Sequence, residues 1–171
     1  MLFHQHNAPA QAAACAQRLA AAFRHIAATR MRGMPLLHPR LAVEAIGFQE
    51  LREEGGLAAS GILLTPWFMN LIWLPLEGQD ACAPGSVREH RLGEDGFDFI
   101  GAREDGFGAY EMCSLFSPMF EFADQAGARA TAWEILGQLR RAAPAAPPPA
   151  AGRRAFLTGR SPRAATAAQA A

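Results

Sequence analysis

Residues 57–76 form a run of twenty residues without a charged side chain. A run of this length can span a membrane as a helix. Pro66 and Pro75 interrupt it, however, and Asn70 places a polar amide near its middle. The apolar pieces that remain have the length of buried strands. We therefore predict two strands joined by a connection at residues 66–69, and no stable membrane insertion.

The sequence on either side of this run predicts an α+β domain. Residues 11–30 are rich in alanine, and their larger apolar residues recur at helical spacing, which indicates an amphipathic helix. Turn signals flank residues 97–103, and aromatic residues alternate along 107–112, as is typical of an antiparallel hairpin or meander. We predict an antiparallel sheet packed by an N-terminal and a C-terminal helix.

The C-terminal helix is predicted from Ser117-Pro118, a favourable N-cap and first helical residue. We expect it to run to about Arg141. In that frame, Glu121 and Asp124 lie one turn apart near the helix start. The apolar residues of this frame mark the face expected to pack on the sheet: Met119, Phe122, Ala126, Ala130, Trp133 and Leu136.

Beyond Ala142 the composition changes to alanine and proline, which indicates a spacer that cannot be helical. We therefore expect a single domain over residues 1–142 and a flexible, disordered tail over residues 143–171. The tail carries a twin-arginine-like stretch made of Arg153, Arg154, Phe156 and Leu157.

The formal charge of zero hides an asymmetry between the two parts of the chain. Six of the 16 arginines follow Glu134, the last carboxylate, so residues 1–134 hold ten arginines against 16 acidic residues. An acidic body disfavours nucleic acid and favours basic partners, although surface carboxylates also serve solubility alone. The three cysteines show no paired spacing, and residues 1–9 show no signal-peptide pattern, so we expect a cytoplasmic protein.

Searches for catalytic and metal-binding motifs find none, and we predict no enzyme, no cofactor and no metal site. Cys113 is the one candidate for a reactive thiol, because it precedes the predicted helix start, although a buried core cysteine is the commoner case. The large apolar residues Pro66 to Met69 stand where a polar turn is expected. They predict either an exposed site for a peptide segment or a plug of the core.

Four stretches, taken together and in order, resemble the HybE/HupJ family of accessory proteins for [NiFe]-hydrogenase assembly. They are residues 35–39 (PLLHP), 65–69 (TPWFM), 113–119 (CSLFSPM) and 152–159 (GRRAFLTG). The resemblance implies a cytoplasmic chaperone for a hydrogenase precursor, in particular the small subunit with its twin-arginine signal peptide, and in addition the large subunit. Some relatives are associated with rubredoxin-type modules, but this chain lacks the paired cysteines that such modules need.

A twin-arginine signal presents two guanidinium groups followed by apolar residues, so its site needs carboxylates beside an apolar surface. We expect the partner-binding residues to be Pro66, Trp67, Phe68, Met69, Glu121 and Asp124. The tail stretch at Arg153 is a candidate pseudo-signal that occupies this site until a precursor displaces it. The alternative function is a thiol-dependent redox or oxygen-protection protein that uses Cys113 for the cluster-bearing subunit.

Overall fold

The structure, a computed structural model, describes residues 8–53 and 55–141. The predicted division into a domain and a flexible tail after residue 142 therefore stays a prediction. The twin-arginine-like stretch with Arg153, Arg154, Phe156 and Leu157 also lies outside the described residues.

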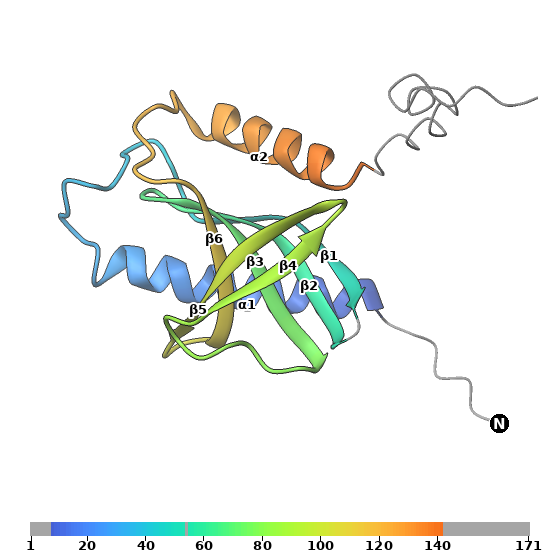
Figure 1. The fold of residues 1–171 in the computed structure, drawn as a ribbon. Coiled ribbons are helices and arrows are strands. Elements are labelled where there is room, and N and C mark those ends of the chain that lie inside the picture. Colours follow the sequence, from blue (N-terminus) through green and yellow to red (C-terminus); the bar gives the residue numbers. More distant parts are fainter. Residues whose placement is uncertain (1–7, 54, 142–171) are drawn as a thin grey trace, which may run out of the picture. The chain divides into compact units, whose positions relative to one another are not determined.

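Two helices and six strands make up the described chain (Figure 1). In order they are α1 (Ala8–Ala28), β1 (Glu44–Glu53), β2 (Gly56–Leu64), β3 (Met69–Gly78), β4 (Val87–Leu92), β5 (Asp95–Glu104), β6 (Gly108–Phe116) and α2 (Gln125–Leu139). The strands form one antiparallel sheet in the order β1-β2-β3-β6-β5-β4. The predicted α+β class, with a helix before and a helix after an antiparallel sheet, is confirmed.

The uncharged run of the sequence becomes the centre of this sheet. Neighbouring residues of β2 belong to two different hydrophobic cores, because their side chains point to opposite faces. Ala59 and Leu63 pack with α1, whereas Ala58 and Ile62 pack with α2. A strand covered on both faces has no solvated position for a charge, which explains the run of twenty uncharged residues. No helix among the described residues is long and apolar enough to cross a membrane.

The predicted start of the C-terminal helix is wrong by seven residues. The helix begins at Gln125, and the side chain of Asp124 caps it by accepting a hydrogen bond from the Gly127 N–H at 2.9 Å. Residues 117–124 instead form turns, anchored by Met119, which is fully buried in the core on the α2 side. An aspartate is as good an N-cap as a serine, so the capping signal at Ser117 was not sufficient to fix the helix start.

This shift also changes which face of α2 packs on the sheet. Ala128, Ala132 and Leu136 are buried, whereas Ala126, Ala130 and Trp133 are exposed. The indole of Trp133 is 51 % exposed and lies over Gly47 of β1, where a Cβ atom would come within 2.9 Å of it. The prediction that Trp133 belongs to the core face is therefore wrong.

The sequence prediction also missed β4, and it placed a turn at Asp95-Gly96, where β5 begins. Residues 93 and 94 make the turn between these two strands. This β4–β5 hairpin reaches the end of α2, since a Cβ on Gly93 would lie 2.6 Å from the carbonyl oxygen of Leu139. The sheet thus curls toward α2 on its β4 side, as Figure 1 shows.

Candidate functional site

Three loops meet at one end of the domain, at the left of Figure 1. They are residues 29–43, the turn 65–68 and the segment 117–124, and three of the four stretches that carry the family resemblance lie in or next to them. His38 donates its backbone N–H to the Pro66 carbonyl at 2.8 Å. The hydroxyl of Ser117 donates to the Trp67 carbonyl at 3.4 Å. Segments distant in sequence are therefore joined through their backbones.

The His38 side chain is the centre of this junction. It is buried, and its Nδ1 accepts a hydrogen bond from the Arg40 N–H at 3.1 Å. Because Nδ1 accepts, Nε2 carries the proton and donates to the Phe122 carbonyl at 2.9 Å. The neutral imidazole of His38 thus connects the first loop to the third, while the backbone N–H of His38 connects the first loop to the second.

The predicted binding residues of the turn 65–68 are interior rather than exposed. Pro66, Trp67 and Met69 are buried, and Phe68 is half-buried with its ring 5.6 Å from that of Phe23 in α1. The Thr65 hydroxyl oxygen accepts hydrogen bonds from the backbone N–H groups of residues 67 and 68, which closes the turn. The expectation of an exposed groove at residues 66–69 is therefore wrong, and the alternative of a core plug holds.

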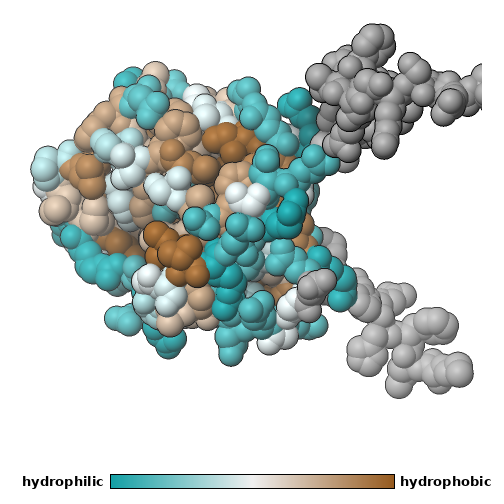
Figure 2. Space-filling view, viewed as in Figure 1, coloured by the Kyte–Doolittle hydropathy of each residue, from teal (hydrophilic) through white to brown (hydrophobic). Residues whose placement is uncertain are grey.

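The other two predicted residues, Glu121 and Asp124, are exposed in the third loop. They do not share a helical turn, because α2 starts only after Asp124. Large apolar side chains are exposed on the first and third loops: Phe120 is 53 % exposed, Met34 47 % and Leu36 37 %. We call the surface formed by these three residues with Glu121 and Asp124 the three-loop surface. In Figure 2, hydrophobic and hydrophilic residues lie side by side at this end of the molecule.

Cys113 does not lie at a helix start, contrary to the prediction. It is a half-buried residue of β6. Burial raises the pKa of its thiol, and the nearby carboxylate of Asp98 raises this pKa further. Both effects disfavour the thiolate that a nucleophile requires.

A buried polar cluster, which the sequence analysis missed, lies at the opposite end of β3. Glu111 of β6 is fully buried. It accepts hydrogen bonds from the Cys82 N–H at 2.8 Å and from Arg88 at 2.9 Å. His90, also buried, lies with its Nε2 2.6 Å from the second carboxylate oxygen of Glu111, and its Nδ1 is 3.4 Å from Glu53. The cluster therefore links β1, β4 and β6, including both edge strands of the sheet.

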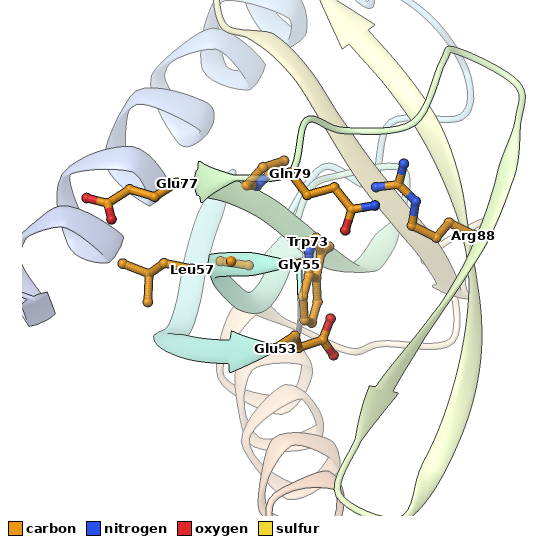
Figure 3. Close-up of a pocket in the computed structure, with 10 residues that line it drawn as sticks. Glu53, Gly55, Leu57, Trp73, Glu77, Gln79 and Arg88 are labelled. Atoms are coloured by element: carbon orange, nitrogen blue, oxygen red, sulfur yellow. The ribbon is translucent and has the colours of Figure 1, made fainter.

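The pocket beside this cluster is too small for a side chain or a cofactor. Figure 3 shows it between Trp73, Glu53, Gln79 and Arg88, with the Glu77 carboxylate directed away. Its volume is about 20 Å³, which is room for one or two water molecules. Trp73 closes it from inside by stacking on His90, with ring centroids 4.0 Å apart. The cluster of Glu53, Arg88, His90 and Glu111 thus holds the two edge strands of the curled sheet together, and we call it the clasp. No spacing in the sequence relates Glu111 to His90.

Among the described residues, no group of three or more histidine, cysteine or acidic side chains is arranged to hold a metal ion.

The model of the family described as [NiFe]-hydrogenase assembly, chaperone, HybE matches residues 14–159, which is most of the chain. The chain belongs to this HybE family. The predicted resemblance is confirmed, and the chain is accordingly a hydrogenase assembly chaperone.

Relatives of this HybE-family chain agree with the assignment. It is 51 % identical over 158 residues to Protein HoxT of Cupriavidus necator, covering 84 % of this chain and 88 % of HoxT. It is 37 % identical to the hydrogenase expression/formation protein HupJ of Bradyrhizobium diazoefficiens, covering 90 % and 92 % of the two chains. The solution structure of HybE from Escherichia coli matches with a TM-score of 0.57 and 25 % identity, over 87 % of this chain and 91 % of that one.

Proposed function

We propose that this chaperone binds the precursor of a [NiFe]-hydrogenase small subunit through its twin-arginine signal peptide, in the cytoplasm and before export. The contact is the three-loop surface. The observation that carries the proposal is the exposure of Phe120, Leu36 and Met34 on the two loops that His38 joins, one of which also carries the exposed carboxylates of Glu121 and Asp124. A signal peptide with paired guanidinium groups and apolar residues is complementary to such a surface.

Family membership supports this assignment, because the chaperone must engage a hydrogenase precursor by some exposed surface. Pro66, Trp67 and Met69 support that surface from below and do not contact the peptide. His38 keeps the loops together, so the exposed apolar residues are held in place before binding, which limits the entropic cost of association. The large subunit is a second client that the same surface can receive.

The test is a titration of the full chaperone with the small-subunit precursor and with the same subunit lacking its signal peptide. Phe120→Ala should weaken precursor binding about tenfold, as expected for a central aromatic contact. Glu121→Gln with Asp124→Asn should weaken it about threefold to tenfold, since exposed ion pairs contribute roughly 0.2–1 kcal/mol each. Asparagine still caps α2, so this double variant removes charge without removing the N-cap.

Glu77→Gln is the matched control, because Glu77 is an exposed carboxylate at the other end of β3. It should bind the precursor as the unmodified chaperone does. Equal affinity for the subunit with and without its signal peptide would refute the signal-peptide assignment. Equal affinity of all variants would move the site away from the three-loop surface.

The alternative, thiol chemistry at Cys113, is disfavoured by the raised pKa of this thiol. Cys113→Ser is expected to leave hydrogenase activity in cells unchanged, with thermal unfolding as the check on the fold. Loss of mature hydrogenase with an intact fold would instead support a redox or oxygen-protection role.

A further inference from the structure

The sheet is split between β5 and β6. The two strands pair from Ile100 with Met112 to Glu104 with Gly108. Beyond Ile100, residues 95–99 pair only with β4, and residues 113–116 pair only with β3. Because the β4–β5 hairpin turns toward the end of α2, β5 and β6 diverge beyond this pairing (Figure 1). Within the described ranges, the backbone of residues 113–116 has no strand partner on the side that faces β5. We call this opening the seam.

Half-buried apolar side chains surround the seam. They pack against the core on the α2 side and are Phe97, Cys113, Leu115, Phe116, Ile135 and Leu139. Figure 2 shows hydrophobic residues gathered beneath α2 on this side of the molecule. An unpaired strand edge bordered by apolar side chains is the feature to which an additional strand binds.

The charges at the seam favour a basic partner. Asp98 and Glu89 are directly opposite each other in the β4–β5 register, an unfavourable placement for two carboxylates. In the described part of the chain, neither has an ion-pair partner within 4.0 Å. The carboxylate of Asp98 is also close enough to Cys113, on the other side of the seam, to raise the pKa of that thiol. A guanidinium group placed here would relieve the repulsion.

We propose that an extended segment of the hydrogenase precursor adds as a strand to the free edge of residues 113–116, with a basic side chain directed at Asp98. This inference rests on the proposed function and specifies how the client is held. The inward side chains of the added strand contact Leu115 and Phe97, and the outward ones contact Asp98. The occupant is therefore an extended segment that carries apolar residues at alternate positions and a basic residue at one position between them.

The seam lies next to the three-loop surface, so one client peptide can contact both. β6 ends at Phe116, and the next residues form the third loop of the three-loop surface. The rings of Phe116 and Phe122 are in edge contact, with centroids 5.1 Å apart. A peptide that places its arginines on the loops can therefore continue along β6 without crossing the core.

The decisive experiment uses synthetic peptides of the small-subunit signal sequence, each with one backbone nitrogen methylated. Methylation removes a hydrogen-bond donor and leaves every side chain in place. If the peptide adds as a strand, alternate positions should be sensitive, and affinity for the full chaperone should fall about tenfold or more at every second residue. A peptide held only by its side chains shows no such alternation, and that result would overturn the inference.

Two chaperone variants locate the site. Leu115→Glu and Asp98→Arg should each weaken binding of the unmodified peptide about tenfold, whereas Arg103→Glu, an exposed change farther along β5, should not. Within residues 113–116, the backbone amides that point toward β5 should also become protected from hydrogen exchange when peptide is added. If Phe120→Ala weakens binding but neither seam variant does, the seam inference fails and the proposed function stands. If the unmodified peptide does not bind at all, the proposed function itself fails.

Discussion

The buried carboxylate of Glu111 allows a quantitative test of the clasp. Glu111→Ala removes the acceptor for Arg88, His90 and the Cys82 N–H at once. Breaking a buried ion pair from one side costs about 3–5 kcal/mol, because the remaining partners lose their compensation. The Arg88 side chain is 29 % exposed and can turn partly to water, so we expect the lower end, about 3 kcal/mol.

Glu111→Gln separates charge from hydrogen bonding at this position. Glutamine has nearly the same shape and keeps one acceptor oxygen, so part of the network survives. The loss should be about 1.5–3 kcal/mol, the range for one hydrogen bond to a charged group, and smaller than the loss for Glu111→Ala.

The matched control is the surface pair of Arg30 and Glu104. Its atoms are 2.8 Å apart, almost the same as the 2.9 Å of Arg88 and Glu111, but the Arg30 side chain is 62 % exposed. Glu104→Ala should therefore cost no more than about 1 kcal/mol. Distance is matched within this comparison, and burial is the variable.

Urea unfolding followed by far-ultraviolet circular dichroism is the assay. With a slope of about 2 kcal/mol per molar urea, Glu111→Ala should lower the midpoint by about 1.5 M and Glu104→Ala by less than about 0.5 M. The slopes should stay unchanged, so that the midpoints report stability alone. If Glu111→Ala and Glu104→Ala shift the midpoint equally, the buried cluster does not act as a clasp.

Three further changes test other parts of the structure. Trp67→Ala should lower the free energy of unfolding by about 3–5 kcal/mol, whereas the same change at half-exposed Trp133 should lower it by about 1 kcal/mol. Similar losses for the two variants in denaturant titrations would contradict the assignment of Trp67 to the core and Trp133 to the surface. Gly47→Ala should lower the melting temperature by several degrees, because Gly47 has φ +61° and a Cβ would lie 2.6 Å from Leu136; an unchanged temperature would show that the site relaxes freely. Deletion of residues 143–171 should tighten binding of the signal peptide if the stretch at Arg153 is a pseudo-signal, and weaker or equal binding would count against autoinhibition.

Strong periodic patterns were sufficient to predict much of the fold. The uncharged run predicted β2 and β3 because a strand buried on both faces excludes charge, and the alanine-rich segment predicted α1 for its regular apolar spacing. The sequence of β4, by contrast, is Val-Arg-Glu-His-Arg-Leu, which looks like a solvated segment. Its inward positions are Arg88, His90 and Leu92, and two of these are polar only because Glu111 lies opposite them.

The candidate site was harder to predict from the sequence than the fold was. Glu121 and Asp124 were predicted as exposed carboxylates and are exposed, but the helix that was expected to carry both begins only after Asp124. Trp67 was ambiguous because an aromatic residue in a turn serves a core or an interface equally well. The exposure of Phe120 depends on the position of Met119 in the core, a long-range contact that no local pattern reports.

The unequal cover of the sheet has a consequence for where the domain first opens. α1 packs against β1, β2 and β3, and α2 packs against β1 and β2. The β4–β5 hairpin is therefore held by its own pairing, by the pairing of residues 100–104 with β6, by the clasp and by the turn at Gly93. Segments with fewer buried contacts open at lower free energy than the global unfolding transition. We therefore expect the amides of β4 to exchange their hydrogens faster than those of β2 and β3, by a local opening that leaves the rest of the domain folded.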